Sequence, residues 1–230
     1  MSEMRIAILI PGFQVEDTIG SVVSDALSMV GDVLVVDDGS TDRTAEVARA
    51  AGAEVLRHER NRGKGAALVT GMEHLRAQGF THALSMDADG QHLGSELQVL
   101  LEACRSEPDA IIVGARRRDE DQEVAGIRRF GNDFANWWVA FASGRRFPDT
   151  QSGFRVYPLE KTLALQARGD RYQFESEVLI LAARRGMAVS SRPVCVYYPP
   201  PSELVNHYRP WIDTIRIIRS VGAFSLGFRR

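Results

Sequence analysis

The stretch Ser85-Met86-Asp87-Ala88-Asp89-Gly90-Gln91-His92 decides how the rest of this 230-residue sequence is interpreted. It follows the apolar run Thr81-His82-Ala83-Leu84, which predicts a buried strand. Residues i and i+2 of a strand face the same side, so Asp87 and Asp89 can reach one cation. Hard oxygen ligands at the carboxyl end of a strand indicate Mg²⁺ or Mn²⁺ with positions left for substrate phosphate oxygens. The alternative is an acidic turn that binds nothing.

Strands and helices alternate along the chain, which predicts an α/β fold with a mostly parallel sheet and helices on both faces. Helical spacing is clear in the second segment, where apolar residues recur on one face. The predicted strands cover residues 5–10, 33–36, 53–56, 81–84, 110–113 and 187–196. The predicted helices cover residues 18–29, 44–51, 93–104, 126–141 and 178–185, with one more ending near Ala77.

Composition and charge restrict the class of protein. Hydrophobic residues make up 44% of the chain, as in a globular protein with a sizeable core. The net charge of −2 argues against a general polyanion binder, so we expect no nucleic-acid partner. Two cysteines are too few for a disulfide framework, and the N-terminus has no signal-peptide layout. No apolar run reaches the ~20 residues that span a bilayer. We expect a cytoplasmic protein, soluble or peripheral to the inner face of the membrane.

Two other loops are candidates for ligand binding. Asp37 and Asp38 end an aliphatic strand, where a carboxylate can accept hydrogen bonds from a base or ribose, or can cap the next helix. Gly63-Lys64-Gly65 lets the backbone pass close to a ligand, or forms a structural turn. It lacks the G-x-x-x-x-G-K-[ST] frame, and no G-x-G-x-x-G opens the first helix, so P-loop and dehydrogenase interpretations are weak.

Arginines in the second half of the chain suggest a phosphate clamp. Arg116 follows a predicted strand and Arg129 begins a predicted helix, and a guanidinium matches phosphate geometry through its planar fork. Arg117, Arg118 and Arg128 are as readily explained as surface charges. The charged run at 119–123 suggests a loop over the site, or a solvated connector.

Four motifs together resemble the family 2 glycosyltransferases. They are Ile10-Pro11-Gly12-Phe13-Gln14-Val15-Glu16-Asp17-Thr18-Ile19, Val35-Val36-Asp37-Asp38-Gly39-Ser40-Thr41-Asp42, Asn61-Arg62-Gly63-Lys64-Gly65-Ala66-Ala67 and Asp87-Ala88-Asp89-Gly90-Gln91-His92. They occur in the family's order, and the similarity spans roughly residues 5–195. The branch that the sequence is most similar to is that of the dolichyl- and polyprenyl-phosphate sugar transferases. Gln14 departs from the asparagine that is common at its position.

The resemblance implies the GT-A fold and a metal-dependent, inverting transfer from a UDP- or GDP-linked sugar. It places Asp37 and Asp38 near the base or ribose, and Asp87, Asp89 and Gln91 around the Mg²⁺ or Mn²⁺. The residues expected to bind the nucleotide sugar are Pro11, Phe13, Glu16, Asp37, Asp38, Lys64, Asp87 and Ala88.

On the acceptor side, Asp149-Thr150-Gln151-Ser152-Gly153-Phe154-Arg155-Val156-Tyr157 matches a family motif. The resemblance implies that Asp149, Gln151, Ser152 and Arg155 bind the acceptor. Glu175 stands in the first turn of a predicted helix, where the family often carries its acidic base; a carboxylate there also suits the helix dipole. The residues expected to serve catalysis are Asp89, Glu175, Arg116 and Arg129.

The C-terminal segment departs from that branch. Prolines at 199–201 predict an extended spacer between a catalytic domain, residues 1–200, and an extension, residues 201–230. His207 either completes the metal shell or is an ordinary surface or core histidine. From Trp211 onward, aromatic and basic residues alternate in an amphipathic pattern. This predicts peripheral contact with an anionic membrane, or packing on the domain or on a partner subunit in a homo-oligomer.

The function expected from this sequence is therefore sugar transfer to a lipid-linked or polyprenyl phosphate. Such an acceptor is already an anion and needs no strong base. If the acceptor is instead a hydroxyl, Glu175 or Asp149 would have to take its proton. A sugar nucleotidyltransferase or a non-catalytic sugar-nucleotide-binding protein is less favoured, because Pro11-Gly12-Phe13-Gln14 is not a Gly-rich, Arg-containing loop and the acidic pair is present.

Overall fold

The computed structural model describes residues 3–90, 94–117, 126–169 and 173–195, and the side chains of residues 94–95 and 126–132 are outside the description. Within these ranges no helix is both long and apolar enough to cross a membrane. Gln91, His207 and the whole extension from residue 201 lie outside the described residues. The predicted division at residue 200 therefore stays a prediction.

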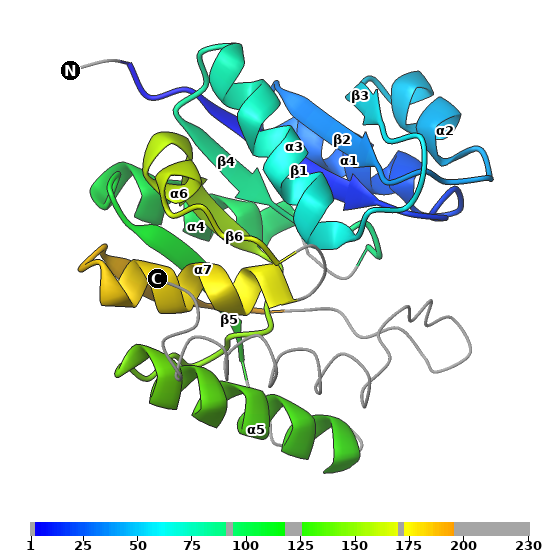
Figure 1. The fold of residues 1–230 in the computed structure, drawn as a ribbon. Coiled ribbons are helices and arrows are strands. Elements are labelled where there is room, and N and C mark those ends of the chain that lie inside the picture. Colours follow the sequence, from blue (N-terminus) through cyan, green and yellow to red (C-terminus); the bar gives the residue numbers. More distant parts are fainter. Residues whose placement is uncertain (1–2, 91–93, 118–125, 170–172, 196–230) are drawn as a thin grey trace.

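The described strands form one twisted sheet in the order β3-β2-β1-β4-β6-β5-β7 (Figure 1). They are β1 Ile6–Gly12, β2 Val33–Asp37, β3 Glu54–Arg57, β4 His82–Ser85, β5 Ile111–Arg116, β6 Arg155–Pro158 and β7 Val189–Val194. All neighbours pair in parallel except β6, which runs antiparallel to both β4 and β5. The predicted α/β class and mostly parallel sheet are confirmed.

Helices cover both faces of the sheet, so the molecule has three layers (Figure 1). The helices are α1 Ile19–Met29, α2 Thr44–Ala50, α3 Lys64–Ala77, α4 Gly94–Ser106, α5 Gly126–Ser143, α6 Leu159–Ala164 and α7 Gln173–Arg184. Side chains alternate along each strand, so Ile8 and Ile10 pack with α1, α2 and α4, while Ala7 and Leu9 pack with α3, α5, α6 and α7. Each face has its own apolar core.

Two strands extend beyond the apolar residues from which they were predicted. β1 includes Pro11 and Gly12, which pair with Val36 and Asp37 of β2. The missing N–H of Pro11 does not break the sheet, because alternate residues of β1 bond to β4, whose last paired residue is Ser85, opposite Leu9. β5 likewise continues to Arg116, because β7 pairs with it through that residue.

β6 and α6 are absent from the prediction. β6 is only four residues long and begins with a charged residue, Arg155, so no alternation marks it as a strand. It is a strand because β4 and β5 supply hydrogen-bonding partners on both sides. Its reversed direction has a consequence for function. Because β6 is antiparallel, the loop that enters it, residues 149–154, lies at the same edge as the carboxyl ends of β4 and β5.

Candidate active site

Two loops at the carboxyl ends of β1 and β2 are tied together by hydrogen bonds. The backbone N–H of Gln14 donates to Ser40 Oγ at 2.9 Å, and that of Val15 donates to Thr44 Oγ1 at 2.9 Å. Gln14 has a positive φ of 54°, a conformation that lets the chain turn sharply after Phe13. Glu16 accepts from the backbone and side chain of Arg43. These contacts give the predicted nucleotide side of the site a defined shape.

Asp37 and Asp38 are both buried at this edge, and each already has protein partners. Asp37 Oδ1 accepts from the backbone of Ser40 at 2.9 Å, and its Oδ2 lies 3.1 Å from Arg57 Nε. Asp38 accepts from the backbone N–H groups of Arg62 and Gly63 at 2.8 and 2.7 Å. Asp38 therefore shapes the loop that leads into α3. A contact of either carboxylate with a base or ribose stays a prediction.

Asp38 also contacts His58, whose Nδ1 lies 2.7 Å from Asp38 Oδ1. The other ring nitrogen lies 3.0 Å from Thr70 Oγ1 on α3. This chain of polar contacts joins β2, β3 and α3 beneath the loop. Local sequence patterns could not predict these contacts, because the residues involved are spread from position 38 to position 70.

A lysine joins the acidic stretch after β4 to the start of α7. Lys64, the first residue of α3, places its ammonium nitrogen 2.5 Å from Asp87 Oδ1 and 2.9 Å from Glu175 Oε1. The Lys64 side chain is 17% exposed and that of Glu175 only 4%. Burial alone would lower the pKa of Lys64, but the two carboxylates outweigh it and hold the pKa above its ordinary value. The lysine is therefore a fixed positive charge at neutral pH.

Gly153 passes directly over this cluster. A Cβ added to it would lie 2.6 Å from Asp87 Oδ2 and 2.6 Å from Lys64 Nζ, closer than atoms can approach. The carbonyl of Gly153 accepts a hydrogen bond of 2.7 Å from Ser85 Oγ, which fixes the loop to the end of β4. A larger residue at position 153 would require the Asp87 carboxylate and the Lys64 ammonium to shift.

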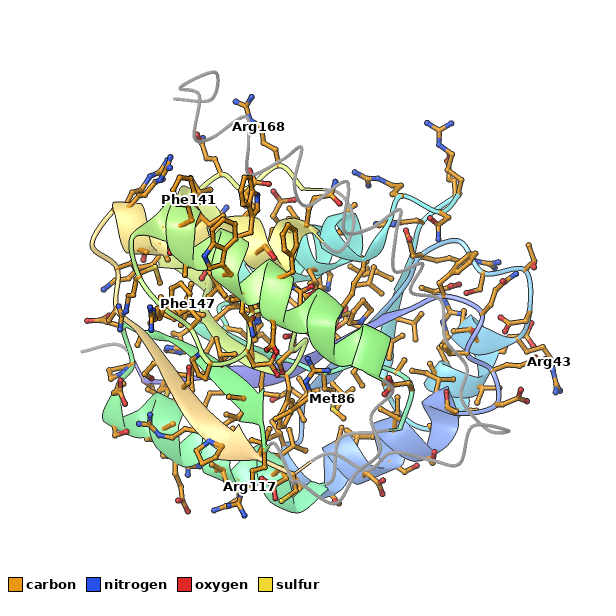
Figure 2. All side chains as sticks on the ribbon, turned by 90° about the horizontal axis from the view of Figure 1, so that it is seen from below. Arg43, Met86, Arg117, Phe141, Phe147 and Arg168 are labelled. Carbon is orange, nitrogen blue, oxygen red and sulfur yellow. The ribbon has the colours of Figure 1, made fainter. Side chains whose placement is uncertain are left out.

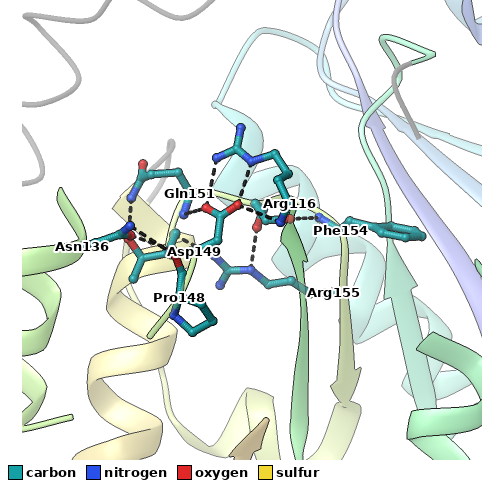
Figure 3. Close-up of polar contacts among 9 residues, drawn as sticks. Arg116, Asn136, Pro148, Asp149, Gln151, Phe154 and Arg155 are labelled. Atoms are coloured by element: carbon teal, nitrogen blue, oxygen red, sulfur yellow. Dashed lines mark hydrogen bonds and ion pairs between the residues drawn. The ribbon is translucent and has the colours of Figure 1, made fainter. Parts of the chain in front are cut away.

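Arg116 and Asp149 form a bidentate ion pair at the end of β5 (Figure 3). Arg116 Nε donates to Asp149 Oδ2 at 2.7 Å, and its Nη2 donates to Oδ1 at 3.0 Å. Burial alone would raise the pKa of Asp149, but the hydrogen bonds and charge of Arg116 hold it below the ordinary value. The predicted partner of Arg116 in a phosphate clamp, Arg129, has no described side chain.

Arg155 is fully buried, and each of its three side-chain nitrogens donates to a main-chain carbonyl. It donates to Ser152 at 2.7 Å, to Glu175 at 2.7 Å and to Thr150 at 2.9 Å. These bonds hold the 149–153 loop against the first turn of α7. Arg155 thus supports the site from beneath, and the acceptor contact predicted for it would require it to leave these three partners.

The loop is also fixed from α5. Asn136 Oδ1 accepts from the backbone and the hydroxyl of Thr150 at 2.9 and 2.7 Å. Gln151 donates from its backbone to Asp149 and from its side chain to Ser176. Ser152 is buried and accepts from the backbone of Phe154. Asn136 and Thr150 were not predicted as site residues, since contacts between distant segments leave no local pattern.

The residues after β4 fit a cation that is shared with substrate phosphates. Asp87 and Asp89 are partly exposed, whereas Ala88 between them is buried and its carbonyl accepts from Thr18 Oγ1 at 2.6 Å. In the described part of the chain no group of three or more His, Cys, Asp or Glu side chains could hold a metal by itself. One or two carboxylates completed by phosphate oxygens is the usual way that Mg²⁺ is bound.

The structure brings most of the predicted residues to one edge of the sheet. Pro11, Asp37, Asp87 and Arg116 lie at or just beyond the ends of β1, β2, β4 and β5, and the loop into β6 joins them. Lys64 and Glu175 come from the first turns of α3 and α7. Such an edge is where open α/β sheets bind ligands.

Comparison with known proteins identifies relatives. The family model described as Glycosyl transferase family 2 matches residues 7–162. Glycosyltransferase AglJ of Haloferax volcanii is 33% identical over 199 residues, which cover 85% of this chain and 64% of AglJ. A UDP-N-acetylglucosamine–dolichyl-phosphate N-acetylglucosaminyltransferase of Methanococcus voltae is 26% identical, over 86% of this chain and 88% of its own length.

A solved structure has the same fold. Glucosyl-3-phosphoglycerate synthase from Mycobacterium tuberculosis, in complex with Mn²⁺, UDP and phosphoglyceric acid, matches with a TM-score of 0.72 and 20% identity. The match covers 98% of this chain and 78% of that one. It confirms the GT-A fold. Because the family model matches well over half of the sequence, the chain belongs to glycosyl transferase family 2 and is a glycosyltransferase.

Proposed function

We propose that this enzyme transfers a sugar, with inversion, from a nucleotide-diphosphate sugar to the phosphate of a lipid-linked acceptor such as a polyprenyl phosphate. The observation that carries the proposal is that both candidate bases are already engaged by cations. Glu175 lies 2.9 Å from the ammonium of Lys64, and Asp149 accepts hydrogen bonds from two guanidinium nitrogens of Arg116. An acceptor that is already an anion needs neither of them as a base.

The donor side supports the same reaction. Asp87 and Asp89 would hold a Mg²⁺ or Mn²⁺ ion together with the diphosphate of the donor, since such ions are usually bound by one or two carboxylates and substrate phosphates. When bound, such an ion supplies Lewis-acid neutralisation of the charge on the leaving nucleoside diphosphate. The solved relative from M. tuberculosis is titled as a complex with Mn²⁺ and UDP. Lys64 adds a fixed positive charge beside Asp87, which stabilises negative charge that develops near it.

On the acceptor side, the guanidinium of Arg116 stands at the end of β5 with its plane set by Asp149. A guanidinium oriented in this way suits the oxygens of a phosphate. The M. voltae relative is named for transfer to dolichyl phosphate, a lipid-linked acceptor. The second candidate, transfer to a hydroxyl, would require Glu175 or Asp149 to leave its cation first.

Turnover separates this proposal from other uses of the fold. A UDP- or GDP-linked sugar, incubated with the enzyme, Mn²⁺ and a polyprenyl phosphate, should release a nucleoside diphosphate in step with glycosylated lipid. A sugar phosphate and a nucleoside triphosphate should give no pyrophosphate. Release of pyrophosphate would indicate a nucleotidyltransferase, and binding of the sugar nucleotide without any turnover would indicate a non-catalytic binding protein.

A further inference from the structure

A buried histidine directly after β3, His58, has no part in the proposed reaction, although it contacts a carboxylate at the edge of the sheet that forms the site. The side chain of His58 is 6% exposed and that of Asp38 is 4% exposed. Nδ1 of the ring lies 2.7 Å from Asp38 Oδ1, and Nε2 lies 3.0 Å from Thr70 Oγ1 on α3. Because a carboxylate only accepts, Nδ1 carries a hydrogen that it donates to Asp38. Contacts at both nitrogens hold the ring in one orientation.

Asp38 connects this histidine to the loop that begins α3. Its Oδ1 also accepts from the backbone N–H of Arg62 at 2.8 Å, and its Oδ2 accepts from that of Gly63 at 2.7 Å. Gly63 directly precedes Lys64, the first residue of α3. The orientation of the Asp38 carboxylate therefore fixes the backbone from which the Lys64 side chain extends.

The loop that begins α3 is packed closely against the loop that follows β2. A Cβ added to Gly39 would lie 2.5 Å from the main-chain carbonyl carbon of Arg60. The backbone N–H of His58 donates to the carbonyl of Asp37 at 2.9 Å, so the histidine lies where the two loops meet. In such a closely packed place, a carboxylate that changes its orientation has to move the loop bonded to it.

At the other end of this connection, the ammonium of Lys64 has little freedom. It lies 2.5 Å from Asp87 Oδ1 and 2.9 Å from Glu175 Oε1. Asp87 directly follows Met86, which is 2% exposed and lies in the interior of the molecule (Figure 2). The carboxylate of Asp87 also lies directly against Gly153. Asp87 is thus held in place and cannot follow a lysine that moves.

We propose that His58 is a positioning residue for glycosyl transfer: through Asp38 it fixes the loop at residues 60–63, and thereby holds the ammonium of Lys64 between the two carboxylates. Its effect on turnover rests on the proposed function, in which Lys64 stabilises negative charge that develops beside Asp87. The histidine itself takes no part in the chemistry. Its contacts matter because a misplacement of about 1 Å near reacting groups can lower a rate by about 10²-fold.

The test compares two histidines that each contact a carboxylate. His74 on α3 lies 2.6 Å from Glu54 on β3, but these side chains are 29% and 46% exposed. His58→Leu and His74→Leu each remove one such contact, and His58→Asn keeps an N–H near the place of Nδ1. The full chain is used throughout. The measurements are amide hydrogen exchange over residues 61–65 and steady-state kinetics with a UDP- or GDP-linked sugar, Mn²⁺ and a polyprenyl phosphate.

His58→Leu should speed amide exchange over residues 61–65 and lower kcat by about tenfold to a hundredfold. KM for the donor should change less, because Lys64 acts on charge that develops in the transition state. His58→Asn should recover most of both properties, and His74→Leu should behave as wild type. Wild-type exchange and kcat in His58→Leu would overturn the proposal, and so would equal defects in His58→Leu and His58→Asn.

A milder variant keeps the test valid if His58→Leu does not fold. Thr70→Val removes only the contact with Nε2 and keeps the shape of the side chain. It should lower kcat by about twofold to tenfold, the range that corresponds to one hydrogen bond. A kcat equal to that of wild type would show that the orientation of the ring does not matter, and the proposal would be wrong.

A double-variant cycle shows whether the histidine acts through the lysine. Lys64→Gln alone should lower kcat, and His58→Leu added to it should lower kcat little further, because the group that the histidine positions is already gone. Independent effects of the two changes would overturn the proposal. If the wild type does not use a polyprenyl phosphate, the proposed function fails. Amide exchange then decides the role of His58, and equal exchange over residues 61–65 in wild type and His58→Leu would refute it.

Discussion

The ammonium nitrogen of Lys64 lies 2.5 Å from Asp87 Oδ1, although one residue begins α3 and the other follows β4. The same nitrogen lies 2.9 Å from Glu175, so one cation balances two carboxylates from different elements. This arrangement fixes the acidic stretch in place before any substrate arrives. It also means that the predicted donor side and the predicted acceptor side of the site share the charge of Lys64.

Removing that charge should destabilise the protein. Lys64→Met would leave Asp87 and Glu175 facing each other, and we expect unfolding free energy to fall by about 2–4 kcal/mol, after discounting for the partial exposure of Asp87. Urea denaturation measures this. The control is Lys161→Met, whose ion pair with Asp109 is exposed and should contribute at most about 1 kcal/mol. Equal losses in both variants would contradict the role given to Lys64.

The acidic pair should carry the metal dependence. Asp89→Asn keeps the shape of the side chain and removes its charge, so Mn²⁺-dependent turnover should fall at least ~100-fold, the scale of a lost electrostatic contact in a transition state. Asp25→Asn, on the exposed side of α1, should behave as wild type. Undiminished Mn²⁺-dependent turnover by Asp89→Asn would remove Asp89 from the site.

A single methyl group added at position 153 should lower turnover. Gly153→Ala places a Cβ 2.6 Å from both Asp87 and Lys64, so the loop or the ion pair has to move. We expect turnover to drop by more than about tenfold, since small misplacements near reacting groups are costly. Gly31→Ala serves as the control, because its added Cβ would meet nothing within 4 Å. Normal steady-state kinetics for Gly153→Ala would show that this approach is not needed.

The Arg116–Asp149 pair should make stability depend on pH in a defined window. The pKa of Asp149 is below its ordinary value in the folded protein, so the pair contributes fully above the unfolded value of about 4 and is lost as pH falls below it. The difference in unfolding free energy between wild type and Asp149→Asn should therefore be largest near pH 7 and shrink toward pH 3. A difference that stays constant over this range would contradict the assignment.

Glu175→Gln distinguishes the two classes of acceptor. With a hydroxyl acceptor, loss of a general base should lower the rate by ~10²–10⁴. With a lipid phosphate the rate should change little, because no proton is taken and Lys64 keeps Asp87 as a partner. Initial rates with each acceptor decide this. A deep loss with a lipid phosphate would mean that Glu175 does more than hold Lys64.

Local periodicity was enough to predict most of the fold. The apolar face of α1, with Ile19, Val22, Val23 and Ala26, is buried as its spacing predicts. β6 could not be predicted, because a four-residue strand headed by Arg155 is created by its neighbours on both sides. Antiparallel entry of β6 is what turns the 149–154 loop toward the site, so the sequence could place this motif only through the family resemblance.

Only part of the candidate site could be predicted, because local sequence patterns do not show which distant residues come into contact. Residues at strand ends, such as Asp87 and Arg116, could be placed on one edge because parallel strands end together. Contacts between side chains of different helices, strands and loops could not be predicted in this way. The contacts of Lys64 with Glu175 join residues more than a hundred positions apart, and Arg155 proved to be buried beneath the loop instead of exposed to a ligand.

The central claim is that the acceptor is a lipid phosphate, and a comparison of two acceptors tests it. A polyprenyl phosphate and the matching polyprenol, identical except for the phosphate, are each incubated with the enzyme, Mn²⁺ and a panel of UDP- and GDP-linked sugars. Glycosylated lipid is then quantified by mass spectrometry. We predict a polyprenyl-phosphate sugar from one of the donors and no product from the polyprenol. Glycosylation of the polyprenol, or of neither lipid while a soluble hydroxyl acceptor is used, would contradict the account.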